Sequence, residues 1–484
     1  MLFRMIYDDT LAQAAYLIGC PASGEALLVD PERDIDRYQA IAKKEKLRIT
    51  AVTETHIHAD FLSGARECAQ QTGAKLYLSA EGGPDWTYQW LDQKHGSGSY
   101  NHVLLHTGDT FTVGDIELKT LHTPGHTPEH VSFLVTDRGS GASEPMGILS
   151  GDFIFVGDLG RPDLLETAAG QVGAREPAAR QLYGSVRASA PLADFLQVWP
   201  AHGAGSACGK ALGAVPQSTL GYERRFSPAI NAAAQGENRF LEYILAGQPE
   251  PPLYFARMKR LNRDGPPLLG SLPQPDQLDA QGAAKLDAEA MAVIDTRTWA
   301  QFKSGHLPGS IYAPLGQMFS AVVGSYVDPD RSILLVVDET RLDEAVRNLV
   351  RIGYDKVEMW CPTQELVQAL NERTDTRQSQ DGQPEQLMAD GSAEAFVLDV
   401  RSQAEFNAGH IPGAHHVAYT RLVDNLQNIP RDRPVIVNCQ GGGRSARAYS
   451  YLQAQGFDAI NLAGGFQGWT NADGEVERDN FVGV

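Results

Sequence analysis

The stretch Thr55-His56-Ile57-His58-Ala59-Asp60-Phe61 decides how the first half of this 484-residue chain is interpreted. It follows residues 48–52, an apolar, partly β-branched run that predicts a buried strand. Two histidines and an aspartate therefore leave the end of a strand together, and we expect their side chains to project into a cleft. Alternating histidine and carboxylate side chains are typical metal ligands.

Three later segments supply further polar side chains. His126 follows the Pro124-Gly125 bend, and His202 follows the short apolar run 198–201. Asp152 interrupts the apolar stretch 147–156, which predicts a strand. An aspartate surrounded by hydrocarbon needs a cation or a hydrogen-bond network to stay ionised.

His56, His126 and Asp152 together form a set of two histidines and one carboxylate. Such a set with open coordination positions suits Fe(II) and oxygen chemistry, whereas zinc hydrolases tend to keep more nitrogen ligands. Other residues of these segments are expected either to bind the metal or to orient its ligands: His58, Asp60 and His202.

These motifs give residues 1–245 a resemblance to the persulfide dioxygenases of the metallo-β-lactamase superfamily, whose signature is THxHxDH. The resemblance implies an αββα sandwich and one Fe(II) per chain, held by His56, His126 and Asp152. Phe61 stands where the signature has a further histidine. A benzyl ring offers no lone pair, so we expect one metal ion rather than two.

Two further features of the first half concern the substrate. Residues 160–163 resemble the GRxD loop of this family, which implies that Arg161 helps to shape the pocket for the thiol. Cys208, which follows the His202 turn, and Cys20 are candidates for holding or relaying sulfur, and a buried structural role is the alternative for both.

An internal repeat organises the second half of the chain. Residues 293–309 recur as 397–413, and each copy has a strand ending in Asp-x-Arg and then a Gly-His-x-Pro-Gly turn. The pattern resembles the rhodanese fold and predicts two α/β modules with mostly parallel sheets.

The second module has a cysteine loop, Cys439-Gln440-Gly441-Gly442-Gly443-Arg444-Ser445, between a predicted strand and a predicted helix. Its glycines allow backbone N–H groups to turn toward the Cys439 sulfur, and Arg444 adds positive charge. We expect this loop to stabilise a persulfide on Cys439. The corresponding residues 332–342 contain neither cysteine nor glycine, so the first module is predicted to be degenerate.

The whole chain resembles the bacterial multidomain persulfide dioxygenase–sulfurtransferases. The resemblance implies that a small thiol persulfide and O2 give sulfite and thiol, and that Cys439 then transfers sulfur to sulfite to give thiosulfate. The predicted domain boundaries follow the motifs: a dioxygenase domain at 1–245, a linker at 246–275, a degenerate rhodanese domain at 276–372, a linker at 373–387 and an active rhodanese domain at 388–484.

Composition narrows the class of protein. A formal net charge of −19 argues against binding nucleic acid. Five cysteines fit reactive thiols in a reducing compartment better than a disulfide framework, so we expect a cytoplasmic protein. No stretch is long and apolar enough to suggest a membrane span, and a homo-oligomer is expected.

Two other functions remain open at this stage. One is a zinc-dependent thioesterase similar to glyoxalase II and fused to rhodanese domains, which would need a binuclear site. The other is a non-catalytic sulfur carrier.

Overall fold

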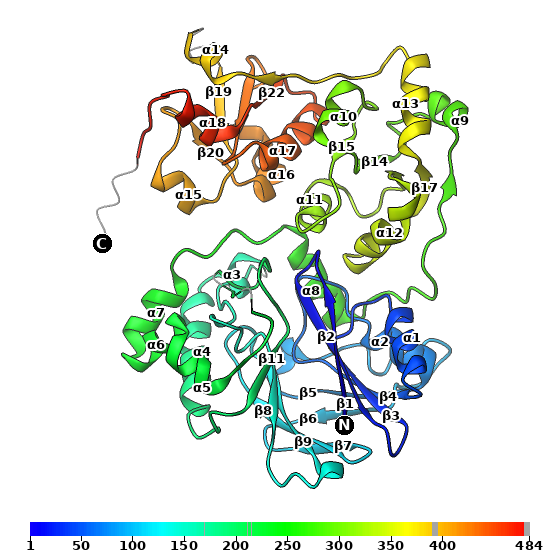
Figure 1. Cartoon of the computed structure of the whole chain (residues 1–484), viewed down its shortest axis with the longest axis vertical. Coiled ribbons are helices and arrows are strands. Elements are labelled where there is room, and N and C mark those ends of the chain that lie inside the picture. Colours follow the sequence, from blue (N-terminus) through cyan, green and yellow to red (C-terminus); the bar gives the residue numbers. More distant parts are fainter. Residues whose placement is uncertain (169, 211, 214, 390–394, 479–484) are drawn as a thin grey trace. The chain divides into compact units, whose positions relative to one another are not determined.

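Two six-stranded sheets form the centre of the first part of the chain (Figure 1). Their strand orders are β1-β2-β3-β4-β5-β6 and β12-β11-β10-β9-β8-β7. The strands of the first sheet are β1 Leu2–Asp8, β2 Gln13–Cys20, β3 Glu25–Val29, β4 Arg48–Thr53, β5 Lys75–Ser79 and β6 His102–Leu105. Those of the second are β7 Thr110–Val113, β8 Ile116–His122, β9 Val131–Asp137, β10 Gly147–Gly151, β11 Gln197–Pro200 and β12 Ser218–Thr219.

Helices pack against the outer faces of both sheets. α1 (Asp36–Lys44) and α2 (Ala65–Thr72) share a core with the first sheet, whereas α4 (Arg175–Ala188), α6 (Pro228–Ala234) and α7 (Glu237–Leu245) share one with the second. A third core lies between the sheets. β2 and β9 are buried along their whole length because both faces of each sheet are covered. The predicted αββα sandwich is confirmed.

The computed structural model describes residues 1–168, 170–210, 212–213, 215–389 and 395–478. They divide into two compact units, Met1–Leu272 with Val350–Gly353, and Pro273–Leu349 with Tyr354–Val484. None of the described helices has the length and apolar character needed to cross a membrane.

Local structure differs from expectation in two places in the first unit. The segment 246–275, expected as a linker, contains helix α8 (Tyr254–Asp264), and the first unit extends to Leu272. The strand expected over 147–156 ends at Gly151, whose positive φ of 52° turns the chain. Asp152 therefore stands at the end of β10 and not within it.

The second unit contains two five-stranded parallel sheets with equivalent strand orders, β13-β17-β16-β14-β15 and β18-β22-β21-β19-β20. The first sheet consists of β13 Asp276–Gln277, β14 Ala292–Asp295, β15 Ile311–Tyr312, β16 Ile333–Val336 and β17 Val357–Cys361. The second consists of β18 Asp381–Gly382, β19 Phe396–Asp399, β20 His415–His416, β21 Val435–Asn438 and β22 Ala459–Leu462. The predicted pair of α/β modules is confirmed. The expected linker 373–387 supplies β18, the outer strand of the second sheet.

The repeat extends to helix capping. α10 (Trp299–Ser304) and α15 (Gln403–Ala408) begin at equivalent positions, and each starts with a capping box, from Thr298 to Gln301 and from Ser402 to Glu405. Each box satisfies backbone N–H groups that a helix start would otherwise leave unpaired. The two modules therefore share local chemistry as well as strand order.

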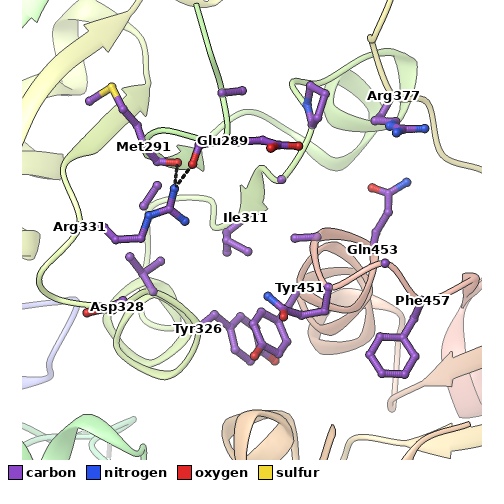
Figure 2. A pocket seen from close by; sticks show the side chains of 18 of the residues that line it. Glu289, Met291, Ile311, Tyr326, Asp328, Arg331, Arg377, Tyr451, Gln453 and Phe457 are labelled. Atoms are coloured by element: carbon purple, nitrogen blue, oxygen red, sulfur yellow. Dashed lines mark hydrogen bonds between the residues drawn. The ribbon is translucent and has the colours of Figure 1, made fainter. Parts of the chain in front are cut away.

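The two modules of this unit also share a small apolar core, which includes Phe302 and Tyr312 from the first module and Ala446 and Tyr449 from helix α17 (Gly443–Ala454). A cavity of about 800 Å³ lies beside this contact (Figure 2). Arg331 donates hydrogen bonds to two backbone carbonyl groups at its wall.

Candidate functional site

The predicted metal ligands follow the ends of strands from both sheets of the first unit. β4 leads into His56, and the loop after β8 carries His126. β10 and β11 run parallel, with Gly151 paired to Pro200, so Asp152 and His202 emerge at the same edge of the second sheet. The strand topology therefore gathers segments that lie far apart in the sequence.

The structure brings the side chains of His56, His126 and Asp152 together. Their ligand atoms all lie within 4.8 Å of one another. Oδ2 of Asp152 is 3.3 Å from Nε2 of His126 and 3.9 Å from Nε2 of His56. All three side chains are buried, and neither carboxylate oxygen has a hydrogen-bond partner among the described residues. Because an unpaired buried carboxylate is costly, the arrangement fits a bound cation.

Hydrogen bonds to Nδ1 of His56 and His126 orient the two rings so that Nε2 of each faces Asp152. Nδ1 of His126 is 3.1 Å from the carbonyl oxygen of Arg161, which can only accept, so Nδ1 carries the proton. Thr55 Oγ1 donates to Asp30 Oδ2 (2.9 Å) and lies 3.0 Å from Nδ1 of His56, from which it accepts. Nε2 of each ring therefore keeps its lone pair for a metal ion.

The electrostatics of these three residues also suit a metal ion. Burial lowers the pKa of His56 and of His126 well below the usual range, so both rings are neutral and able to bind a cation. Burial raises the pKa of Asp152 to about 6, against the opposing influence of His202. A cation at this point would favour the ionised carboxylate.

His58 points to a different partner. Its Nε2 lies 3.1 Å from Oδ1 of Asp30. Burial alone would lower the pKa of His58, but the charge and hydrogen bond of Asp30 raise it to about 9. His58 is not one of the side chains whose ligand atoms meet at Asp152, and its contact with Asp30 fits a role in orienting the loop. Phe61 is fully buried, and its ring packs against His58 at a centroid distance of 4.4 Å.

Asp60, His202 and Cys208 form a second group whose ligand atoms lie within 4.8 Å of one another. Nε2 of His202 is 3.4 Å from Oδ2 of Asp60 and 3.5 Å from Oδ1 of Asp152. Burial, followed by the negative charges of Asp60 and Asp152, raises the pKa of Cys208 well above the usual range. The Cys208 thiol is therefore protonated at neutral pH and a weak nucleophile.

Arg161 and Cys20 lie in very different surroundings. The guanidinium of Arg161 is buried in a two-bonded ion pair with Asp163 (2.9 and 2.6 Å) and also donates to the carbonyl oxygen of Ala207. It therefore positions the Cys208 loop and does not present a free charge to a substrate. Cys20 ends β2, whose first residue, Gln13, pairs with His202. Seven residues of strand place Cys20 about 23 Å from that end, too far for a direct relay.

The Cys439 loop has the form that its sequence predicts. Cys439 follows β21 and is buried. Gly442 N donates to its Sγ at 3.1 Å, and Ser445 Oγ donates at 3.3 Å. Gly442 adopts a φ of 91°, a conformation that favours glycine. Two donors directed at one sulfur stabilise negative charge on it.

Other residues of the Cys439 loop contact residues outside the loop. Gln440 accepts a hydrogen bond from Arg401 (3.3 Å), and Gly441 lies exposed beside it. Arg444 donates to both carboxylate oxygens of Glu405, at 2.7 and 2.6 Å. Burial would raise the pKa of Glu405, but the bonds from Arg444 and from the backbone of Ser402 lower it to about 2. Arg444 is therefore charge-paired, and its effect on the sulfur is weaker than its sequence position predicts.

The first module has no equivalent of this cysteine. Asp295 pairs with Val336 in its sheet as Asp399 pairs with Asn438 in the second sheet. Val337 therefore occupies the position of Cys439. An isopropyl group can neither carry sulfur nor be deprotonated.

Sequence reasoning missed two residues that orient the metal ligands. Asp30 accepts from both the backbone and the side chain of Thr55, and His130 Nε2 accepts from the backbone N–H of Asp152 at 2.9 Å. Asp30 follows the apolar strand β3 as Asp152 follows β10, and the same pattern could have revealed it. His130 gives no such signal.

Helix α8 contributes further residues that the sequence did not mark. Nδ2 of Asn262 donates to the carbonyl oxygens of His58 (2.9 Å) and Phe61 (2.7 Å), and its Oδ1 accepts from the backbone N–H of Ser63. Lys259 is also buried, with its ammonium 3.9 Å from the ring centroid of Trp86. These residues lie in a proline-rich segment whose composition predicts a linker.

Comparisons with known proteins agree with this architecture. The family described as "Metallo-beta-lactamase superfamily" matches residues 8–193, and the family described as "Rhodanese-like domain" matches residues 279–359 and 383–472. The crystal structure of a metallo-beta-lactamase from Staphylococcus aureus subsp. aureus COL is 39% identical, with a TM-score of 0.66, and covers 75% of this chain and 98% of that chain.

Two curated proteins are similar to parts of the chain. "Thiosulfate sulfurtransferase GlpE" of Pseudomonas fluorescens is 40% identical over 99 residues, which are 20% of this chain and 91% of that protein. "Beta-lactamase hydrolase-like protein" of Agrobacterium fabrum is 27% identical over 319 residues, 61% of this chain but only 66% of that protein's length. The chain belongs to the metallo-β-lactamase superfamily and carries rhodanese-like domains after its metallo-β-lactamase domain.

Proposed function

We propose that this protein is an Fe(II)-dependent persulfide dioxygenase whose last domain converts the sulfite product to thiosulfate. The first reaction is R–S–SH + O2 + H2O → R–SH + SO3²⁻ + 2 H⁺. In the second, Cys439 takes the outer sulfur of another persulfide and transfers it to sulfite. The order of domains expected from the sequence, with a degenerate rhodanese domain between the dioxygenase domain and the active rhodanese domain, belongs to the same proposal.

The observation that carries the first half is the unpaired carboxylate of Asp152 between two neutral histidines. His56 and His126 direct Nε2 toward it, and this donor set suits Fe(II) with open positions for other ligands. Iron bound there would supply the redox chemistry that O2 requires. The protein residues orient the donors and exclude water, because the site is buried.

The Cys439 loop supports the second half. In the loading step, the Cys439 thiolate attacks the outer sulfur of R–S–S⁻, the S–S bond breaks, and the thiolate R–S⁻ leaves. The Gly442 N–H and the Ser445 hydroxyl point toward Sγ, so they stabilise the Cys439 thiolate that attacks in this step and that re-forms when the sulfur is transferred.

The test combines metal content with gas and product analysis on the full chain. We expect about one iron per chain, O2 uptake that requires a persulfide such as glutathione persulfide, and loss of both iron and uptake in Asp152→Ala. A matched control is Asp109→Ala, a change in the loop between β6 and β7. Iron-loaded protein that takes up no O2 with any persulfide would refute the proposal.

The Asp60, His202 and Cys208 group favours a second candidate. Three donors within 4.8 Å could hold another ion beside the first, with Asp152 between them. A two-zinc thioesterase would then result despite Phe61. Two zinc ions per chain, with hydrolysis of a glutathione thioester and no O2 uptake, would favour this candidate over the dioxygenase.

A further inference from the structure

Helix α17 carries a second arginine beside the Cys439 loop. Nη1 of Arg447 donates to the carbonyl oxygen of Gly443 at 2.8 Å. Nε of Arg447 is buried and has no hydrogen-bond partner, and Arg447 has no carboxylate partner among the described residues. A guanidinium with a buried unused donor is suited to receive an anion.

Arg444 is less suited to that role. Both of its terminal nitrogens already donate to Glu405, and this ion pair balances its charge. Of the two arginines at the start of α17, Arg447 is therefore the one with uncompensated charge. The Arg447 guanidinium also lies against the loop itself, because a Cβ added at Gly443 would be 3.6 Å from Nη1.

The first rhodanese-like module forms one wall around Arg447. The guanidinium carbon lies 5.6 Å from the ring centroid of Tyr312, at the end of β15. The backbone N–H of Tyr312 donates to Ser450 Oγ on α17 at 2.9 Å. An aromatic face near a guanidinium restrains it without neutralising its charge.

Two contacts of Tyr326, on helix α11 (Phe319–Tyr326), strengthen this arrangement. Its hydroxyl donates to the carbonyl oxygen of Tyr419 at 2.8 Å, and its ring stacks on Tyr451 at a centroid distance of 4.5 Å (Figure 2). Tyr419 and Tyr451 both belong to the second module. The degenerate module thus fixes the helix that carries Arg447.

We propose that Arg447, restrained by Tyr312 of the first module, binds the sulfite that attacks the sulfane sulfur on Cys439. This inference rests on the proposed function and assigns the acceptor site for its second reaction. It also gives the degenerate module a role, because Tyr312 is a positioning residue for a reaction that occurs in its neighbour.

The chemistry explains why a cation is needed. The step is Cys439–S–S⁻ + SO3²⁻ → Cys439–S⁻ + S2O3²⁻. The sulfur lone pair of sulfite forms the new S–S bond, the bond to Sγ breaks, and its electron pair stays on Sγ as the thiolate. Two anions must approach each other, and an unpaired guanidinium reduces their repulsion.

The test isolates this step. Full-length protein is loaded on Cys439 with glutathione persulfide and freed of excess donor, and thiosulfate formation is followed against sulfite concentration. In Arg447→Gln, loss of a charge-assisted hydrogen bond should raise the sulfite KM about tenfold to hundredfold. Arg433→Gln, on an exposed arginine of the same module, is the matched control.

Variants at Tyr312 test the role of the first module. Tyr312→Ala should raise the sulfite KM severalfold, and Tyr312→Phe, which keeps the ring, should restore the wild-type value. Arg447→Gln with an unchanged sulfite dependence would overturn the inference. If loaded wild-type protein forms no thiosulfate from sulfite, the proposed sulfur transfer itself fails, and the inference with it.

Discussion

Residue chemistry behind the metal ligands decides which nitrogen each histidine offers. His56 depends on a chain of two hydrogen bonds through Thr55 to Asp30, whereas His126 needs only the carbonyl oxygen of Arg161. The two histidines therefore differ in how easily a substitution can disturb them. The orientation of His56 is the easier one to disturb by substitution, because the Thr55 hydroxyl links its ring to Asp30.

Thr55→Val tests this difference. Valine keeps the shape of threonine but cannot accept from Nδ1 of His56 or donate to Asp30. We expect iron affinity, measured by competition with a chelator, to fall about tenfold to hundredfold with little change in fold. The control is Thr50→Val on β4, the strand that precedes Thr55. Unchanged affinity would show that packing alone fixes the His56 ring.

Helix α8 shows how one element outside the expected domain supports the site. Asn262 satisfies two carbonyl groups and one N–H group of the loop 58–63, all of them buried. This loop carries Asp60 and Phe61 and follows directly on His56. The helix therefore acts as a brace for the segment that supplies the first ligand.

Asn262→Ala should destabilise the first unit and loosen this loop. It leaves three buried polar groups unpaired, at about 1–3 kcal/mol for each. We expect a lower melting temperature, less bound iron, and faster hydrogen exchange confined to residues around 56–63. Asn238→Ala, on an exposed residue of α7, is the matched control. Equal exchange in both variants would contradict a bracing role.

The same elements show what the sequence could predict. The strands and the ligands at their ends were predictable because apolar runs followed by His or Asp have a direct physical meaning. α8 was not predictable, because proline-rich flanks hid an amphipathic helix that is stabilised by packing. The ion pair of Arg161 with Asp163 was not predictable for a related reason, since nothing in the sequence pattern reveals that the pair is buried.

At the scale of the whole molecule, the fold class and the repeat were predictable, but the relation between the repeats was not. The loss of the cysteine is visible in the sequence, and Val337 confirms it. The contact of Tyr312 with α17 is a tertiary contact between residues about 140 positions apart, and no local pattern encodes it. Local sequence patterns thus identified the residues that could react, whereas the residues that support them depend on tertiary packing.

Cys439→Ser should separate the two proposed reactions of the full chain. O2 uptake with glutathione persulfide should be unchanged, because Cys439 does not belong to the metal site. The product should change from thiosulfate to sulfite, with one sulfite released for each O2 consumed. Cys361→Ser in the first module is the control, and product analysis by thiol-reactive labelling and chromatography is the measurement. Thiosulfate formed at the wild-type rate would place the second reaction elsewhere.

The outer strand β18 has a consequence for how the chain can be divided. It pairs with β22 and comes from the segment that separates the two repeats in the sequence. A fragment excised at the apparent repeat boundary near residue 388 would leave the backbone of β22 bare along one side, ready to recruit a foreign strand. A fragment that begins before β18 keeps the strand that covers this edge of β22. The repeated structural unit is therefore longer than the sequence motif by which the repeat is recognised.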